Sequence, residues 1–323
     1  MGVIMINDLI KSTNLISVPS EYAFPAKPED LNMLSEKEVE HVTLPVIDFS
    51  FLSSPGERSK IIEDLRDACQ YWGFFMVVNH GVPESLKKDL IDSCMSFFDL
   101  SPEEKSAYRG KYKLDPRIVL DHGTNLNSGV DSVSFLRDQF KACVHPIFGS
   151  PPKPEGIKVK KKKKKKKKTN KKIDLHEILC EYTKRSREIM KELLKEIMEG
   201  LKLDEDDIEK SLELNSGAQI FSANLYPPCP QPELAIGLPP HADHGLLTLL
   251  IQNDVDGLHI KNKEKWVAVN LIPNSIMVNT GDHMETLSKG KYKSVLHRAV
   301  VNNKETRVSL VMTVGSSKET DAT

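Results

Sequence analysis

The chain has 323 residues, a formal net charge of -1, 39% hydrophobic residues and 28% charged residues. These values are typical of a soluble globular protein of one large or two ordinary domains, and they give no reason to expect nucleic acid or acidic membranes as partners. No run of about 18 apolar residues is present, so we expect no membrane span, and residues 1–13 lack the pattern of a secretory signal.

The first half of the chain has mostly helical patterns. Residues 1–40 mix proline, serine and charges, which predicts a loosely packed arm. Residues 44–50 predict a short strand, and residues 57–71 predict a helix because apolar side chains recur at three and four positions. The apolar run at residues 73–81 ends in Asn-His-Gly and predicts a buried strand followed by a turn.

Four further helices are predicted before the chain changes character. Apolar spacing indicates one over residues 86–98, and Ser101, Pro102 and Glu104 supply the N-cap, first-turn proline and capping-box acid of the next. Residues 113–154 have poor periodicity, with a possible strand inside residues 134–148. The long amphipathic helix over residues 174–201 is followed by a short acidic one near residues 204–212.

After Gly217 the chain becomes rich in short strands. Seven β-rich runs are bounded by Gly, Pro, Asn or Asp, which predicts a sandwich or barrel. The runs cover residues 218–227, 245–252, 257–262, 265–270, 275–281, 294–302 and 307–314.

Three residue pairs in this half are spaced two apart: Asn224 with Tyr226, His241 with Asp243, and Arg307 with Ser309. Residues two apart on an extended strand point to the same face, so each pair can direct both side chains into one cavity.

A histidine and an aspartate at this spacing supply an imidazole and a carboxylate to one metal ion, and a distant third ligand completes one face of an octahedron. Two histidines and one carboxylate with open positions suit non-haem Fe(II) and oxygen chemistry, although zinc also accepts this set. Arg307 discriminates further, because a guanidinium matches a carboxylate in bidentate fashion and the Ser309 hydroxyl can donate to the same group.

The sequence closely resembles the plant 2-oxoglutarate and Fe(II)-dependent dioxygenases. Four motifs occur in the family's order and spacing: NLYPPCP (residues 224–230), LPPHADHGLLTLLIQND (238–254), YKSVLHRAVVN (292–302) and RVS (307–309). LPVIDFS and YWGFFMVVNHGVP resemble the family's N-terminal region. The resemblance runs from about residue 18 to residue 313 and is interrupted by a lysine-rich segment.

The resemblance implies an α+β fold with a double-stranded β-helix (jelly-roll) core flanked by helices, mostly from the N-terminal half. It implies Fe(II) bound by His241, Asp243 and His297. It also implies 2-oxoglutarate held by Arg307 and Ser309, with Asn224 and Tyr226 near the metal-chelating end. The family uses O2 and 2-oxoglutarate, with ascorbate as reductant, and releases succinate and CO2 as it oxidises its substrate.

Within the family the chain looks most like the group that acts on plant specialised metabolites of flavonoid, terpenoid or alkaloid type. We expect hydroxylation of such a small molecule by a cytoplasmic monomer without a nucleic-acid or membrane partner. Two alternatives stay open: a truncated, non-catalytic relative that binds metal or metabolite, and an ascorbate-using oxidase of the same fold.

We expect five regions along the chain: an arm (1–40), an N-terminal dioxygenase region (41–150), a disordered lysine-rich insertion (151–172), a long and a short helix (173–216) and the jelly-roll core (217–323). Nine consecutive lysines, residues 160–168, cannot pack; we interpret them as a tolerated loop insertion rather than a polyanion site. The family continues beyond residue 323 with a helix that helps cover the substrate opening, and we expect this chain to lack that cover.

The remaining histidines and the cysteines have simpler interpretations. A lone histidine is more often structural than a ligand, and His244 should point away from the site because it alternates with Asp243. Phe135, Phe140 and Phe221 either line the substrate pocket or pack in the core. The five cysteines are scattered without a C-x-x-C pair, which predicts reduced thiols in a cytosolic protein.

Overall fold

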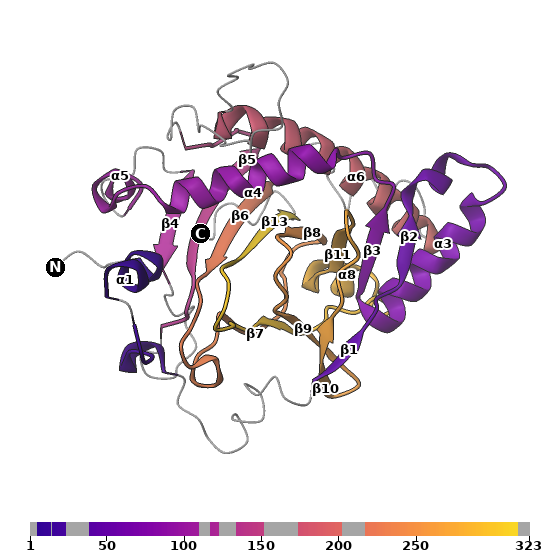
Figure 1. The fold of residues 1–323 in the computed structure, drawn as a ribbon. Helices are drawn as coiled ribbons and strands as arrows, with labels where there is room; N and C mark the ends of the chain where they lie inside the picture. The colour runs from indigo at the N-terminus through magenta and orange to yellow at the C-terminus, as the bar shows by residue number, and fades with distance from the viewer. Residues whose placement is uncertain are drawn as a thin grey trace, which may run out of the picture.

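Two β-sheets face each other in the computed structural model, and helices cover the outer face of the larger one (Figure 1). The structure describes residues 5–13, 15–23, 39–109, 117–122, 134–151, 174–201 and 217–315. The acidic helix predicted near residues 204–212 and the lysine run at residues 160–168 lie outside these ranges. The observed layers are consistent with the predicted jelly-roll core and flanking helices.

The helices and single turns of helix have the following bounds: α1 Ile6–Thr13, η1 Ser20–Tyr22, η3 Phe49–Ser53, α3 Arg58–Asp67, η4 Ala68–Trp72, α4 Glu84–Phe98, α5 Pro102–Ser106, α6 Leu175–Gly200, η6 Pro232–Leu234 and α8 Asp282–Leu287. The helix predicted over residues 57–71 is confirmed as α3 with its π-helical continuation η4, which ends at Gly73 in the left-handed conformation (φ 63°). The predicted capping box at Ser101 is also present, and Asp174 is the N-cap of α6.

The strands have the following bounds: β1 Glu40–Val42, β2 Val46–Asp48, β3 Phe74–Val78, β4 Ile118–His122, β5 Asp138–His145, β6 Gln219–Tyr226, β7 Leu238–His241, β8 Leu247–Gln252, β9 Leu258–Asn262, β10 Lys265–Val269, β11 Ile276–Thr280, β12 His297–Ala299 and β13 Arg307–Val314. The large sheet has the order β2-β3-β11-β8-β13-β6-β5-β4, and the small sheet has the order β1-β10-β9-β12-β7. Strands from before residue 150 therefore complete both sheets.

The alternation of side chains along β3 shows how the layers are built. Phe75 and Val77 are fully buried in the core between the large sheet and the helices α3, α4 and α6. Phe74 and Met76, one position away, pack instead against apolar residues of the small sheet. β3 is apolar at every position because both of its faces are covered, one by the helices and the other by the small sheet. Each fully buried side chain of this size contributes on the order of 2 kcal/mol to folding.

The same two-residue period directs polar side chains into the space between the sheets. Val308 and Leu310 of β13 belong to the helix-side core, which leaves Arg307 and Ser309 on the inner face. On β6, Ala223 and Leu225 face the helices, and Asn224 and Tyr226 face inward by the same alternation. The large sheet therefore presents its buried polar residues to the small sheet.

Three short strands were not predicted from the sequence. β7 contains two adjacent prolines and β1 has only three residues, while β4 lies in a region of poor periodicity. Proline cannot donate to a β-ladder, and β7 is accordingly an edge strand of the small sheet. The proline-rich sequence therefore concealed the strand that ends at His241.

The expectation of a loosely packed arm over residues 1–40 is wrong for its first helix. Ile6 and Asn7 at the start of α1 are buried, and both backbone N–H groups donate to the carboxylate of Asp138, at 2.9 Å each. Asp138 is fully buried at the start of β5. Burial raises its pKa to about 6, although the two backbone donors and Lys105 oppose that shift. A remote aspartate thus caps α1 and attaches it to the large sheet.

We predict that Asp138→Ala releases α1. The substitution leaves two buried N–H donors without an acceptor, so it should lower the free energy of unfolding by about 1–3 kcal/mol, as measured by urea denaturation. Asp99→Ala is the matched control, because Asp99 pairs with Lys11 of the same helix at a site that is about half exposed on both sides. The control should cost less than about 1 kcal/mol. Equal losses in the two variants would contradict the capping role.

Candidate functional site

His241 and His297 lie side by side on neighbouring strands of the small sheet. His241 ends β7, His297 begins β12, and the two are direct partners in the antiparallel register. Their ring centroids are 4.1 Å apart. Residues 56 positions apart in the chain are thereby placed in contact by strand pairing.

Asp243 completes the cluster from the loop that follows β7. Its Oδ1 lies 3.9 Å from His241 Nε2 and 3.7 Å from His297 Nε2. The prediction that His241 and Asp243 share a strand face is wrong, because β7 ends at His241. Asp243 is held by other contacts instead: Asn279 Nδ2 donates to its Oδ2 at 2.8 Å, and the backbone N–H of Asp282 donates to its carbonyl at 2.7 Å.

Both histidines are oriented by their own backbone neighbourhood. The Nδ1–H of His241 donates to the carbonyl of Pro239 at 2.9 Å, and the Nδ1–H of His297 donates to that of Val295 at 3.1 Å. Each Nε2 is therefore left as the acceptor that faces Asp243. Burial and the neighbouring His297 lower the pKa of His241 to about 4, so its ring is neutral at physiological pH.

The Asp243 carboxyl is ionised in this setting. Burial alone would raise its pKa, but the charge interaction with His297 and the hydrogen bond from Asn279 outweigh burial and lower it. The ligand atoms of the three residues lie within 4.8 Å of one another, close enough for all to reach one ion. Two imidazole nitrogens and one carboxylate, with side chains that are 31%, 10% and 19% exposed for His241, His297 and Asp243, suit Fe(II) with open positions.

A close backbone contact fixes the loop that carries Asp243. A Cβ added at Gly281 would lie 2.2 Å from the carbonyl oxygen of Gly245 and 2.6 Å from that of Asp243. Backbone atoms cannot move aside as a flexible side chain can. Gly281, at the start of α8, is therefore required for the loop after β7 to approach the large sheet.

We predict that Gly281→Ala weakens Fe(II) binding at least about tenfold, because the added methyl group displaces the Asp243 backbone. Overpacking of this kind also costs about 1–3 kcal/mol of stability. Anaerobic calorimetry with Fe(II) and urea denaturation measure the two effects. Gly56→Ala is the control, since no atom lies within 4 Å of a Cβ there. Unchanged Fe(II) affinity in Gly281→Ala would show that this contact does not position Asp243.

Arg307 lies on the inner face of the large sheet and is 2% exposed. Its Nη2 donates to Gln252 Oε1 at 2.8 Å, and its guanidinium carbon lies 5.0 Å from the ring centroid of Tyr226. The buried Nε and Nη1 have no hydrogen-bond partner among the described residues. Burial lowers the pKa of Arg307, while Tyr226 and Asp256 oppose that shift. A buried guanidinium with two unused donors suits the carboxylate of a bound ligand.

Ser309 and Asn224 lie opposite each other on β13 and β6, as do Arg307 and Tyr226. Asn224 Nδ2 lies 3.5 Å from Ser309 Oγ, at the limit of a hydrogen bond. The side-chain oxygen Oδ1 of Asn224 accepts from Gln139 Nε2 at 2.8 Å and from Arg137 Nη1 at 3.3 Å. All four residues singled out on these strands therefore belong to one buried polar layer.

The other candidates lie elsewhere. His244 has an 88% exposed side chain and contacts Asp282, so it points away from the site as predicted, although the strand alternation assumed for it is absent because β7 ends at His241. Phe140 and Phe221 are fully buried in the helix-side core, which favours the packing interpretation, and Phe135 packs with Ile236. Among the described residues, the group able to hold a metal contains no histidine besides His241 and His297.

Three positioning residues were missed from the sequence: Asn279, Gln252 and Gln139. Asn279 and Gln252 are polar residues inside or at the end of an apolar run, which is the one signal that marks them. Gln139 follows Arg137 and Asp138 and has no such signal. A buried polar residue needs a partner, but the identity of that partner depends on strand register. All five cysteines are free thiols. Within the described residues, no helix combines the length and apolarity needed to span a membrane.

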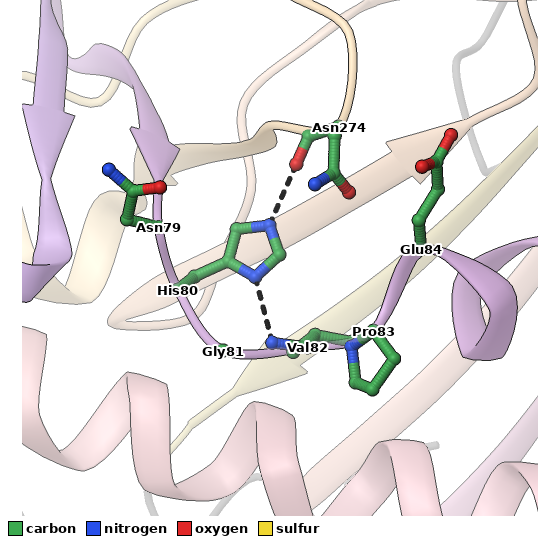
Figure 2. A pocket seen from close by; sticks show the side chains of 7 residues that line it. All are labelled: Asn79, His80, Gly81, Val82, Pro83, Glu84 and Asn274. Atoms are coloured by element: carbon green, nitrogen blue, oxygen red, sulfur yellow. Dashed lines mark hydrogen bonds between the residues drawn. The ribbon is translucent and has the colours of Figure 1, made fainter.

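A separate surface hollow of about 410 Å³ lies between the turn after β3 and Asn274 (Figure 2). Figure 2 shows the His80 ring bridging two segments: Nε2 contacts the carbonyl of Asn274 at 2.9 Å, and the backbone N–H of Val82 donates to Nδ1 at 3.1 Å. Only the neutral ring can make both bonds, because protonated Nδ1 cannot accept. Burial and Lys87 lower the pKa of His80, although the contact with Asn274 opposes the shift.

We predict that His80 makes stability depend on pH. The folded protein holds this ring neutral, so it binds fewer protons than the unfolded chain, whose histidine has a pKa of 6.5. The contribution of His80 is therefore complete above pH 6.5 and is lost as the pH falls below it. The stability advantage of the wild type over His80→Gln should shrink between pH 7.5 and pH 5 in urea titrations. The exposed His176 serves as control, since His176→Gln should keep the wild-type slope. A constant gap for His80→Gln would refute the prediction.

Comparison with known proteins agrees with this geometry. The profile of the 2OG-Fe(II) oxygenase superfamily matches residues 216–316, and that of the non-haem dioxygenase in morphine synthesis N-terminal matches residues 44–163. The chain is 41% identical over 280 residues to 2-oxoglutarate-dependent dioxygenase 19 of Oryza sativa subsp. japonica, covering 86% of this chain and 77% of the relative. It is 33% identical over 319 residues to leucoanthocyanidin dioxygenase of Malus domestica, and the match covers 97% of this chain and 85% of that relative.

Among solved structures, JOX2 in complex with 2OG, Fe and JA superposes with a TM-score of 0.77 at 26% identity, covering 98% of this chain and 84% of that one. The protein belongs to the 2OG-Fe(II) oxygenase superfamily, as the sequence motifs predicted. It is an Fe(II)- and 2-oxoglutarate-dependent dioxygenase of the plant type.

Proposed function

We propose that His241, Asp243 and His297 hold the Fe(II) of this dioxygenase. The convergence of these three ligand atoms within 4.8 Å is the observation that carries the proposal. With O2 and 2-oxoglutarate, bound iron supplies the oxidising power for attack on an unactivated C–H bond. The protein contributes the orientation of the ligands, through Pro239 and Val295 for the histidines and Asn279 for the carboxylate.

Arg307 and Ser309 are proposed to bind the distal carboxylate of 2-oxoglutarate, with Asn224 and Tyr226 near its chelating end. The two unused nitrogens of Arg307 support this role, because a buried cation without an anionic partner is costly. Gln252 fixes the guanidinium through Nη2 and leaves the rest of the fork free. The carboxylate would thus meet preoriented donors in a site from which water is excluded.

The substrate is proposed to be a small plant specialised metabolite of flavonoid, terpenoid or alkaloid type, and the reaction a hydroxylation. The similarity to leucoanthocyanidin dioxygenase supports a small organic substrate. We further propose that ascorbate serves as reductant and that the enzyme acts as a cytoplasmic monomer without a nucleic-acid partner. Purified enzyme with Fe(II), ascorbate and 2-oxoglutarate should release succinate only with its substrate, in equal amount to the oxidised product. A complete absence of succinate across a broad panel of such metabolites would contradict catalysis.

Substitution of Arg307 tests the co-substrate site directly. We predict that Arg307→Ala raises the KM for 2-oxoglutarate by about ten- to a hundredfold, because a charge-assisted hydrogen-bonded pair is lost. Anaerobic Fe(II) affinity should stay within about twofold of wild type. Asp243→Ala is the complementary variant: it should abolish turnover and weaken Fe(II) binding. A normal KM for 2-oxoglutarate in Arg307→Ala would place the carboxylate elsewhere.

A further inference from the structure

The inner face of β5 carries two cations beside the candidate site. Phe140 and Ala142 of this strand are buried in the helix-side core. The two-residue period therefore places Gln139 and Lys141 on the opposite face, toward the space between the sheets. Arg137 lies one residue before the strand, and the contact of its Nη1 with Asn224 Oδ1 places its guanidinium on the same side. None of the three is proposed to contact iron or 2-oxoglutarate, although Arg137 and Gln139 donate to Asn224.

Arg137 is buried and only partly used by its neighbours. It is 5% exposed, and Nη1 donates to Asn224 Oδ1 at 3.3 Å. Its buried Nε has no hydrogen-bond partner among the described residues. Asn224 already accepts a shorter bond from Gln139, at 2.8 Å. The guanidinium thus has donor capacity left beside the layer that joins Asn224 to Ser309.

Lys141 is the exposed member of the group, and its strand neighbour across the ladder is Ser222. In the described part of the chain its amine makes no salt bridge. Burial and the like charge of Arg137 lower the pKa of Lys141, and the carboxylates of Asp121 and Asp243 oppose the shift. The effect of Asp243 on Lys141, and that of Arg137 on His241, place both cations within electrostatic range of the metal ligands.

The carboxylate next to these cations in the sequence is engaged elsewhere. Asp138 alternates with Gln139 along β5 and accepts from the N–H groups at the start of α1. Asp121 lies opposite Gln139 on β4 and opposes the lowering of the pKa of Lys141.

We propose that Arg137 and Lys141 form a subsite for an anionic group of the oxidisable substrate, most simply a carboxylate. This inference rests on the proposed function, because it takes the iron and 2-oxoglutarate to occupy their own ligands. It narrows the substrate class to small organic acids or their equivalents. Lys141 would attract and hold the anion at the accessible end, and Arg137 would donate to it from the buried end.

Matched pairs of acids and amides test the subsite without relying on turnover. The probes are benzoate, cinnamate and hexanoate, each compared with its primary amide. Binding is measured by anaerobic calorimetry to protein saturated with Fe(II) and 2-oxoglutarate, which prevents the probes from entering the Arg307 site. At least one acid should bind about tenfold or more tightly than its amide.

The variants Lys141→Gln, Lys141→Arg and Lys88→Gln separate a built subsite from general surface charge. Lys141→Gln should lower the ratio of acid affinity to amide affinity about tenfold. Lys141→Arg should keep that ratio within about threefold of the wild-type value. Lys88 has a 73% exposed side chain on α4, so Lys88→Gln should have no effect. The affinity for 2-oxoglutarate should be unchanged in all three.

Three results would overturn the subsite. The first is that no acid binds more tightly than its amide. The second is a preference for the acid that survives in both Lys141→Gln and Arg137→Gln, and the third is an equal loss of probe binding and 2-oxoglutarate binding in Lys141→Gln.

Failure of the subsite and failure of the proposed function give different results. If the wild type does not bind 2-oxoglutarate in the presence of Fe(II), the proposed function fails and the subsite with it. If 2-oxoglutarate binds normally but acids and amides bind equally, only the subsite fails.

Discussion

The antiparallel pairing of β12 with β7 is the constraint on which the rest of the site depends. It places His297 directly opposite His241 and leaves both Nε2 atoms free, because each Nδ1 is satisfied by a backbone carbonyl two residues earlier. The third ligand arrives only because the loop after β7 touches the backbone at Gly281. The contact between the loop after β7 and Gly281 therefore positions Asp243, whereas the pairing of β7 with β12 positions the two histidines.

The large sheet contributes a buried cation whose donors are only partly satisfied among the described residues. Arg307 is 2% exposed, its Nη2 donates to a neutral glutamine, and its Nε and Nη1 have no hydrogen-bond partner in the described part of the chain, which is a costly arrangement. The surrounding core, with Val308 and Leu310 packed beneath the helices, keeps that cation in place. An anionic ligand relieves the cost, so part of the free energy of binding is already stored in the folded protein. Gln252 and Tyr226 lessen this cost, because Gln252 accepts from the guanidinium and the Tyr226 ring lies beside it.

Much of the fold could be predicted from the sequence, because periodicity reports burial directly. The long helix α6, the helix α3 and the seven β-rich runs after Gly217 all occur. The ligand residues could be proposed from their chemistry and order. What the pattern could not supply is register and loop placement. β7 was concealed by its prolines, Asp243 lies beyond a strand rather than on one, and α1 is docked by an aspartate more than 130 positions away. Each depends on contacts between distant segments, which no local period encodes.

The partition of charge between the two sides of the large sheet's inner face bears on specificity. Arg307 on β13 and the pair on β5 are separated by β6, whose Asn224 accepts from Arg137 and Gln139 and approaches Ser309. An acid on the β5 side and a dicarboxylic acid on the β13 side would then approach the same hydrogen-bonded layer from its two sides. The Arg307 side is fully buried, whereas the β5 side ends at the exposed Lys141, so the two positions differ in their access to solvent.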